Sequence, residues 1–500
     1  MSIARAEASR TAPPRERVEA QKQAILHALS AGRGDLAERF ARELALSQDL
    51  EGRPDLAAKS LCDLAKHAER MGELGAAESW IDAALARAPN DPIAWSQRIA
   101  LMRRQGRNED RRAWTERMAE RFPDSDVALS TLAASLSSSG QPEAALAIYD
   151  RVIARAPLNA YARNARAALY RRMGRLDLSQ AAYEDNVRIS DADEFALVGV
   201  GSSMRARGDY DGAISVFERA IRRFPESSLS RVRLGEALAA IGRLEESIAS
   251  FDDATRRFPI DVGASRARAR VLLALGRRQE ALVESARLSG RSRNHAGLQI
   301  GRAEALRELG RLDEAAAIYR SVQQRGYLDA FARVSFGMVL LRRHSDQVAS
   351  ALCASGWDPL RQPGSAGEWL LYVARGLVHL RNREPLAETF FQTARGSAFV
   401  DVRARAENAL ALAAVVRGDR SAAIATLSMA EPAKPIAIQG ARALVTALAT
   451  EDASALVAHL RANPLRYSAF SRLRRRVRQD RAVLRLDPSL LDTAIELVLL

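Results

Sequence analysis

Residues 228–261, SLSRVRLGEALAAIGRLEESIASFDDATRRFPID, predict two short helices joined by a tight turn. Leu234, Leu238 and Ile241 recur at helical spacing and form one apolar stripe. The stripe ends at Gly242, and glycine readily adopts the left-handed conformation with which many helices stop. A second apolar stripe follows, with acids in its first turn and a proline after its end, as expected for a second helix. The stretch therefore predicts a helix–turn–helix hairpin.

The same spacing recurs along much of the chain. Glycine returns every 34 residues, at Gly72, Gly106, Gly140, Gly174, Gly208, Gly242, Gly276 and Gly310. Proline follows the same period, with aspartate at the one gap, at Pro89, Pro123, Pro157, Asp191, Pro225 and Pro259. A fixed period of this length indicates a repeat architecture in which each hairpin packs on the next.

The residues inside each unit carry a family resemblance. Small residues and aromatics recur in phase, at Ala77, Ala145, Gly201, Ala213, Gly235, Ala281 and Ala315 and at Tyr149, Tyr183, Phe217, Phe251 and Tyr319. The stretch GRAEALRELGRLDEAAAIYRSV (301–322) resembles the tetratricopeptide-repeat consensus. The resemblance implies an all-α, right-handed superhelical solenoid, with the aromatics in its core and an extended concave binding surface.

The repeat pattern also predicts how the chain is organised, with about twelve hairpins in all. We expect a disordered tail over 1–19, an irregular helical hairpin over 20–57 and eight regular repeats over 58–329. Irregular repeats over 330–464 follow, interrupted by a loop at 356–367, GWDPLRQPGSAG. A basic helix and an apolar helix are expected over 465–500.

Composition limits the classes of protein to be considered. The formal net charge is +14, and lysine occurs only at Lys22, Lys59, Lys66 and Lys434, so arginine supplies most of the positive charge. Such usage is typical of a GC-rich bacterial genome, but it equally fits a functional basic surface. Two distant cysteines and the lack of a signal peptide or a long apolar run predict a cytoplasmic bacterial protein with no membrane span.

The sequence holds no motif for catalysis or for a cofactor. No His or Cys pair has metal-ligand spacing, and nucleotide-binding loops and nucleophile elbows are absent, so we expect no metal, no cofactor and no enzyme activity. GVGSSMRARG (199–208) resembles a phosphate loop, but its place in the repeat favours helix packing by its glycines. A hydrolase or transferase in the C-terminal third is the least favoured hypothesis.

By resemblance to the family, the first helix of each repeat lines a partner-binding groove. Basic residues outnumber acids such as Glu236 and Glu304 on this face. The predicted groove residues are Tyr161, Asn164, Arg171, Arg172, Phe195, Ser202, Arg205, Arg266, Arg270 and Arg307. Arginine can fork onto carboxylates, and asparagine can hold an extended backbone, so the face predicts an acidic peptide or protein as ligand. The alternative is a solvated helix face with incidental arginines.

The C-terminal end provides a second candidate surface. Residues 461–485 hold nine arginines and one acid, and Tyr467 and Phe470 could stack or anchor there. Nucleic acid, another polyanion, an acidic partner or simple capping of the repeats would each explain this helix. The predicted contact residues are Arg472, Arg474, Arg475, Arg476, Arg478 and Arg481. The apolar stretch 486–500 is expected to pack back onto the last repeats, or to form a subunit interface.

Two functions follow from these patterns. The first is a non-catalytic scaffold or adaptor that binds proteins in a bacterial cytoplasmic complex, through its groove and its C-terminal end. The alternative is a nucleic-acid-associated subunit that uses the arginine-rich C-terminal helix, with any enzyme activity on another chain. Steep loss of binding as salt rises would distinguish the alternative from the first.

Overall fold

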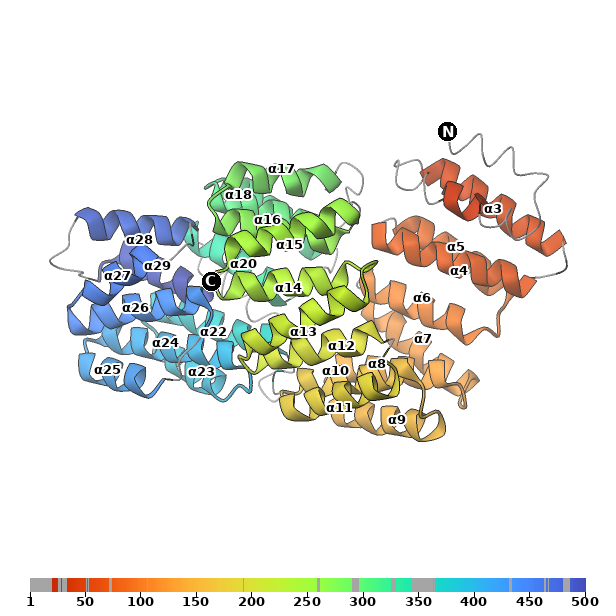
Figure 1. Ribbon diagram of the computed structural model, residues 1–500, viewed down its shortest axis with the longest axis horizontal. Helices are drawn as coiled ribbons and strands as arrows, with labels where there is room; N and C mark the ends of the chain where they lie inside the picture. The colour runs from red at the N-terminus through yellow and green to blue at the C-terminus, as the bar shows by residue number, and fades with distance from the viewer. Residues whose placement is uncertain are drawn as a thin grey trace. The chain divides into compact units, whose positions relative to one another are not determined.

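A computed structural model of the chain is all α-helical (Figure 1). It describes residues 20–25, 28, 34–50, 52, 54–71, 74–105, 107–191, 193–258, 261–289, 296–324, 330–343, 363, 365–430, 434–462, 465, 467–479 and 486–500. Within these ranges no strand occurs, which confirms the predicted all-α repeat solenoid as the fold class. None of the helices in the same ranges is long and apolar enough to cross a membrane.

The chain divides into two compact units. Unit 1 comprises Met1–Pro157, Ala286–Gln299 and Ser321–Tyr327, and unit 2 comprises Leu158–Ser285, Ile300–Arg320 and Leu328–Leu500. The main helices of unit 1 are α3 (Gly34–Leu50), α4 (Pro54–Met71), α5 (Leu74–Arg87), α6 (Pro92–Arg104), α7 (Asn108–Arg121), α8 (Asp126–Ser138) and α9 (Pro142–Arg155). They pack as successive pairs, and Trp80 and Ile81 of α5 are fully buried in a core made mostly of alanine and leucine.

Regular hairpins continue over residues 160–342, which belong to unit 2 except for Ala286–Gln299 and Ser321–Tyr327. Their first helices are α10 (Ala160–Arg172), α12 (Glu194–Ala206), α14 (Leu229–Ala240), α16 (Val262–Ala274), α18 (Ala296–Glu308) and α20 (Ala330–Arg342). Their second helices are α11 (Leu176–Ile189), α13 (Tyr210–Arg223), α15 (Leu244–Arg257), α17 (Arg278–Ser289) and α19 (Leu312–Gln324). Three first helices begin at an acid or amide whose side chain accepts a bond from the backbone, namely Asn159, Asp193 and Asp261.

The periodic glycines end the first helices, as the sequence predicts. Gly174, Gly208, Gly242, Gly276 and Gly310 have φ between 73° and 86°, in the left-handed region that costs other residues free energy. Gly140 of unit 1 is also in the left-handed region, with φ 83°. Gly72 and Gly106 lie outside the described residues. The 34-residue period is therefore the period of a backbone turn that favours glycine.

Other glycines allow the helices of a hairpin to approach closely. A Cβ atom added to Gly201 would lie 2.6 Å from Cε1 of Phe217, and one added to Gly235 would lie 2.6 Å from Cζ of Phe251. Both aromatic rings are buried, as are Tyr149, Tyr183 and Tyr319, which confirms the predicted core role of the periodic aromatics. The stretch 199–206 lies inside α12 and packs in this way, so it is no phosphate loop.

The rest of unit 2 is a C-terminal module, which we define as residues 365–500. Its helices are α22 (Ala366–Arg381), α23 (Leu386–Arg395), α24 (Val400–Arg417), α25 (Arg420–Met429), α26 (Ile436–Thr450), α27 (Ser454–Ala462), α28 (Ser468–Gln479) and α29 (Pro488–Leu499). Gly418 and Glu451 end α24 and α26 in the left-handed conformation, with φ of 85° and 57°. The predicted loop at 356–367 falls mostly outside the described residues.

The apolar C-terminal helix is buried within this module. Leu490, Ala494, Ile495, Leu497 and Val498 of α29 are each at most 3% exposed. The helix packs on α20, α22, α24, α26 and α28. The expectation that 486–500 packs back onto preceding helices therefore agrees with the structure, and burial of this apolar face explains why the helix forms there.

Candidate functional site

The predicted groove residues of unit 2 differ widely in exposure. Tyr161 of α10 and Phe195 of α12 are 63% and 68% exposed, which is high for aromatic side chains. Arg172 and Arg270 are exposed, and Arg171, Arg205 and Arg266 are partly buried. Ser202 and Arg307 are buried, so neither presents its side chain to solvent.

Asn164 has both side-chain amide atoms engaged inside unit 2. Its Nδ2 donates to Asp193 at 2.6 Å, and its Oδ1 accepts from Nδ2 of Asn186 at 2.8 Å. Asn186 in turn accepts from Nε of Arg163 at 2.8 Å. The predicted role of Asn164, holding the backbone of a peptide, would require breaking these bonds, so its evident role is to join α10, α11 and the start of α12.

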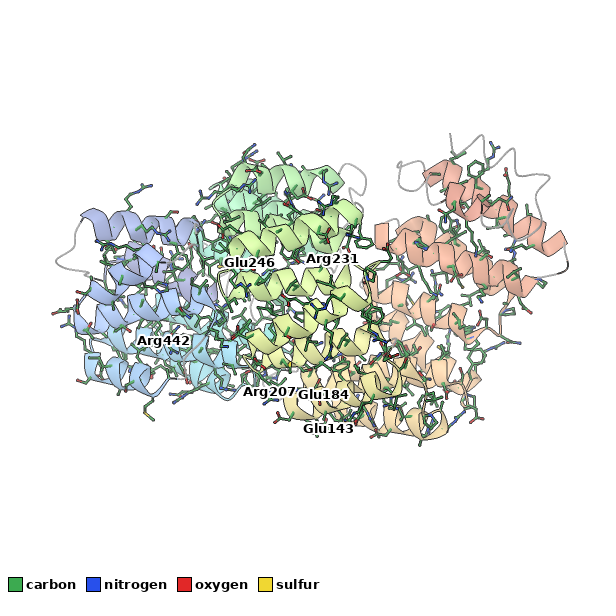
Figure 2. All side chains as sticks on the ribbon, viewed as in Figure 1. Glu143, Glu184, Arg207, Arg231, Glu246 and Arg442 are labelled. Carbon is green, nitrogen blue, oxygen red and sulfur yellow. The ribbon has the colours of Figure 1, made fainter. Side chains whose placement is uncertain are left out.

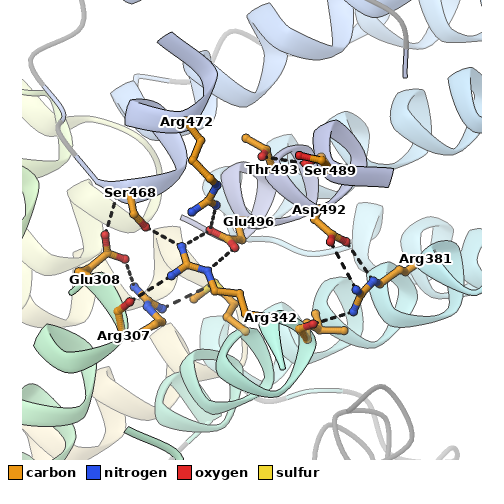
Figure 3. Close-up of polar contacts among 12 residues, drawn as sticks. Arg307, Glu308, Arg342, Arg381, Ser468, Arg472, Ser489, Asp492, Thr493 and Glu496 are labelled. Atoms are coloured by element: carbon orange, nitrogen blue, oxygen red, sulfur yellow. Dashed lines mark hydrogen bonds and ion pairs between the residues drawn. The ribbon is translucent and has the colours of Figure 1, made fainter. Parts of the chain in front are cut away.

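Arg307 likewise belongs to an internal network. Its Nη2 pairs with Glu308 at 3.0 Å, and its Nη1 lies 3.7 Å from the sulfur of Met338 (Figure 3). Its backbone carbonyl accepts from Nη1 of Arg342 at 3.1 Å. Burial would lower the pKa of the Arg307 guanidinium, but Glu308 and other acids outweigh that effect and raise it. Arg307 therefore stabilises the junction of α18 with α20.

Three predicted arginines gather with a fourth on successive first helices. We define the arginine cluster as Arg171 of α10, Arg205 of α12, Arg233 and Glu236 of α14, and Arg270 of α16. Nη1 of Arg233 pairs with Glu236 at 2.9 Å. Arg205 and Arg270 also act electrostatically on Glu236, and Arg205 and Arg233 act on Arg171. The cluster therefore holds four guanidinium groups and one carboxylate.

The charged groups of the cluster shift one another's pKa values. Burial lowers the pKa of Arg171, and repulsion from Arg205 and Arg233 adds to this, while Tyr183 opposes it through a hydrogen bond. Burial would raise the pKa of Glu236, but the arginines outweigh it and hold that pKa below its usual range. Nε of Arg205 is buried and has no hydrogen-bond partner among the described residues. Four guanidinium groups therefore lie near one another, and such a gathering of positive charge favours an anion.

Other arginines of unit 2 form ion pairs with nearby acids. Arg207 pairs with Asp177 at 3.0 Å, Arg231 with Asp253 at 2.6 Å, and Arg243 with Glu246, and Arg207, Arg231 and Glu246 are labelled in Figure 2. Arg277 and Glu280 form an i,i+3 pair of the same kind one repeat later. Arg207, Arg243 and Arg277 each pair with an acid in this way, whereas Arg231 shares Asp253 with Arg256 and Arg257.

Arg233 was missed in the sequence prediction, although the sequence holds a signal for it. The equivalent positions of four neighbouring repeats carry Ala165, Gly199, Ala267 and Gly301. Arg233 is larger than all four of these residues, although Thr131 and Gln97 occupy the same position in earlier repeats. Tyr183, which we expected only as core, also has a polar role because its hydroxyl bonds Arg171.

The basic helix α28 is largely engaged within the module. Arg472 pairs with Glu496 at 2.7 Å, and Arg476 pairs with Asp487. Nη1 of Arg474 donates to the carbonyl of Leu465 at 2.8 Å, and its guanidinium lies 5.9 Å from the ring centroid of Phe470. Arg475 is exposed, and the side chains of Arg478 and Arg481 lie outside the described residues.

The aromatic side chains at the start of α28 are packed against other residues of unit 2. Phe470 is fully buried, and Tyr467 packs against the apolar residues of α16 and α18. Burial raises the pKa of Tyr467 to about 12. Among the described residues, no group of three or more His, Cys, Asp or Glu side chains is arranged to hold a metal ion.

Part of the chain matches a known family in sequence. A tetratricopeptide-repeat family model matches residues 131–194, 201–262, 242–289 and 266–330. No curated protein matches the chain in sequence. Among solved structures, a tetratricopeptide repeat protein from Parabacteroides merdae is similar, with 18% identity, a TM-score of 0.37, and coverage of 57% of this chain and 98% of that one.

A second similar structure is a thermophilic TPR protein from Thermus thermophilus. It has 23% identity and a TM-score of 0.32, and the match covers 35% of this chain and 95% of that one. The family model rests on the residues that form the regular hairpins, each with its glycine turn and its buried aromatic. The hairpins within residues 131–330 therefore match the tetratricopeptide-repeat family, which confirms the resemblance seen in the sequence.

Proposed function

We propose that the protein is a non-catalytic scaffold whose arginine cluster binds an acidic segment of a partner protein. Tetratricopeptide repeats indicate a protein-interaction scaffold as the type of function. The observation that supports the site is that Arg205, Arg233 and Arg270 act on the carboxylate of Glu236, while Arg171 lies beside Arg205 and Arg233. A guanidinium group binds a carboxylate through two parallel hydrogen bonds, so a segment rich in Asp and Glu matches this cluster.

Exposed aromatic residues support a peptide or protein ligand. Tyr161 and Phe195 project from α10 and α12, the helices that also carry Arg171 and Arg205. Aromatic side chains with exposed faces are common anchors in protein interfaces. The proposal therefore assigns the charged part of the partner to the arginines and an apolar residue of it to this aromatic pair, in a bacterial cytoplasmic complex as the composition suggests.

The nucleic-acid alternative has weaker support. It depends on α28, where Arg472, Arg474 and Arg476 are already bonded within the module. Binding phosphates there would compete with these contacts. An acidic partner at the arginine cluster would instead reduce the repulsion of Arg171 by Arg205 and Arg233.

The test is binding of a fluorescent hexaglutamate peptide, followed by anisotropy at low and moderate salt. The double variant Arg171→Gln/Arg205→Gln should bind at least about tenfold more weakly, because each lost charge-assisted pair contributes roughly 1.5–3 kcal/mol. The control variant Arg243→Gln/Arg277→Gln removes the same charge from outer turns and should bind within about twofold of the wild type. Equal weakening by both variants would show non-specific attraction and refute the site.

Duplex DNA of matched charge decides between the two functions in the same assay. The nucleic-acid alternative would be favoured if the protein bound DNA more tightly than hexaglutamate. In that case Arg475→Gln should weaken DNA binding, and Arg171→Gln/Arg205→Gln should not. Melting curves from circular dichroism should show that all variants remain folded. If the arginine cluster is the binding site, Arg475→Gln should bind hexaglutamate as well as the wild type does.

A further inference from the structure

The start of α28 in the C-terminal module contacts the first helices of three later hairpins. The hydroxyl of Tyr467, just before α28, lies 3.5 Å from the backbone carbonyl of Arg270 in α16. The backbone amide of Ser468, the first residue of α28, donates to Oε2 of Glu308 in α18 at 2.7 Å. The hydroxyl of Ser468 accepts from Nη2 of Arg342 in α20 at 2.6 Å. The start of α28 therefore touches three successive first helices.

The end of α29 reaches α20 as well, as Figure 3 shows. Nε and Nη2 of Arg342 donate to the two carboxylate oxygens of Glu496 at 2.5 and 2.6 Å, and Arg472 adds a third bond at 2.7 Å. Two parallel bonds are the geometry in which a guanidinium group recognises a carboxylate specifically. Arg342 therefore already binds a carboxylate, and the chain itself supplies it.

The contacted residues lie at the repeat positions predicted to line the groove. Counted in steps of 34 residues, Arg307 corresponds to the predicted groove residue Arg205. Glu308 and Arg342 correspond in the same way to Arg172, which is exposed. In contrast, the side chains of Arg307 and Glu308 are only 6% and 2% exposed. The predicted groove is thus exposed at α10 and covered at α18.

The open part of the predicted groove has a definite length. The first helices α10, α12, α14 and α16 pack on one another in that order and carry the arginine cluster. Packed helices lie roughly 8–10 Å apart, so these four span about 27 Å. An extended chain advances about 3.3 Å per residue, so about eight residues of a partner would lie across them.

The module is also attached away from the predicted groove. The hydroxyl of Tyr210 donates to Oδ2 of Asp401 at 2.6 Å, and Nζ of Lys434 pairs with Asp211 at 2.7 Å. Tyr210 and Asp211 begin α13, which is a second helix, so this contact is not on the first-helix face. Loss of the contacts at Ser468 and Glu496 should therefore uncover the later first helices without detaching the whole module.

We propose that the start of α28 and the end of α29 are an internal ligand of the groove, held on α18 and α20 by Ser468 and Glu496, and that they confine an acidic partner segment to the open part over α10–α16. This inference rests on the proposed function, because it sets the length of the segment bound at the arginine cluster. Glu496 occupies the guanidinium group of Arg342, which a longer acidic segment would otherwise reach. Uncovering Arg342 should therefore favour long acidic segments over short ones.

The test measures binding of labelled hexaglutamate and dodecaglutamate to the full chain with Ser468→Pro/Glu496→Gln. Proline removes the amide and the hydroxyl that bond Glu308 and Arg342, and a helix tolerates proline at its first position. Glutamine removes the carboxylate from Arg342. The ratio of the two affinities should shift about tenfold towards dodecaglutamate, because the longer peptide gains a charge-assisted pair. The ratio cancels the larger number of registers that the longer peptide offers in both proteins.

The control Ser454→Pro/Glu314→Gln makes the same two chemical changes elsewhere in unit 2. Ser454 is the first residue of α27, and its amide donates to the exposed Asp452 at 2.8 Å. Glu314 forms an exposed pair with Arg311. The affinity ratio of this control should equal that of the wild type. An equal shift in the control would attribute the effect to the lost negative charge or to general loosening, and would overturn the proposal.

Hydrogen–deuterium exchange reports whether the ends of α28 and α29 are released. Exchange in 469–473 and 490–499 should be about fivefold faster or more in Ser468→Pro/Glu496→Gln. Unchanged exchange would show that Ser468 and Glu496 do not hold these ends, and faster exchange with an unchanged affinity ratio would show that the ends do not limit the segment. Either result overturns the proposal. If the double variant does not fold, Ser468→Pro alone, which keeps Glu496, should shift exchange and ratio in the same directions.

The arginine variant separates failure of this inference from failure of the proposed function. If Arg171→Gln/Arg205→Gln bound hexaglutamate as well as the wild type, the proposed function would fail, and this inference with it. If the arginine variant bound weakly but Ser468→Pro/Glu496→Gln left the affinity ratio unchanged, the arginine cluster would still be supported and only the confinement would fail.

Discussion

Arginine supplies nearly all of the positive charge, and its side chains have distinct surroundings. Arg243 and Arg277 pair with acids on exposed turns, where ion pairs stabilise little. Arg342 lies in a mostly buried pair, and Arg205 belongs to the arginine cluster. Net charge therefore gives little information about function until each arginine is assigned to a partner.

Gly201 permits a close helix contact, and this makes a residue-scale prediction. In Gly201→Ala the new Cβ would lie 2.6 Å from Cε1 of the buried Phe217, so one of the two helices must shift. We expect a loss of about 1–3 kcal/mol in the free energy of unfolding. Urea unfolding followed by circular dichroism measures this loss.

Gly301→Ala provides the control in the same unit. The nearest atoms to its new Cβ would be Oγ of Ser285 at 3.5 Å and Cγ of Arg266 at 3.7 Å, which are ordinary contacts. Alanine favours the helix over glycine by up to about 1 kcal/mol, so this variant should be as stable as the wild type or more stable. Equal destabilisation by both variants would contradict the role assigned to Gly201.

Helices are the scale at which the sequence predicts best. The left-handed turns at Gly242 and Gly418 follow from the conformational preference of glycine, and the turn at Gly242 was predicted from the sequence. The turn at Glu451 is also left-handed, although its residue is not glycine. Helix boundaries depend on local interactions, which is why they can be read from neighbouring residues.

The ion pairs of Glu496 with Arg342 and Arg472 support a prediction on how α29 is held in place. Burial would raise the pKa of Glu496, but Arg342 and Arg472 outweigh it and hold the pKa below its usual value. In Glu496→Gln two arginines lose their charged partner, and we expect a loss of about 3 kcal/mol or more at neutral pH. The control Glu314→Gln breaks an exposed pair and should leave stability nearly unchanged.

The pH dependence of this variant follows from the sign of the shift. Because the pKa of Glu496 is lowered by folding, its contribution is complete above the unfolded value of about 4.3 and is lost as the pH falls through the folded pKa. The difference in unfolding free energy between wild type and Glu496→Gln should therefore shrink on acidification below pH about 4. A difference that stays constant down to about pH 3 would exclude the ion pair as its source.

Over the whole molecule, stability should be local. In a repeat protein each helix contacts mainly its neighbours in the stack. Glu496→Gln should therefore speed hydrogen exchange in α29 and in its contact helices α20, α22, α24 and α26, and leave α4 and α5 unchanged. Equal acceleration in α4 and α5 would show that the two units unfold as one.

The candidate site was predictable only in part, because it depends on contacts between distant residues. The repeat period identifies the face that carries Arg171, Arg205 and Arg270. It does not reveal that Asn164 is bonded internally, or that Tyr210 meets Asp401 across 191 residues of sequence. Such pairings arise from how the C-terminal module packs, and no local preference of the backbone specifies them.

Lys434 has a practical consequence, because it is the one lysine in residues 158–500 and it lies 2.7 Å from Asp211. A carbodiimide condenses an amine with an adjacent carboxylate and inserts no spacer, so the two side chains can be joined by a single amide. An amine-reactive dye would likewise label unit 2 at this position alone. The chain thus offers chemists a natural attachment point at which the module can be fastened or watched, without introducing any foreign residue.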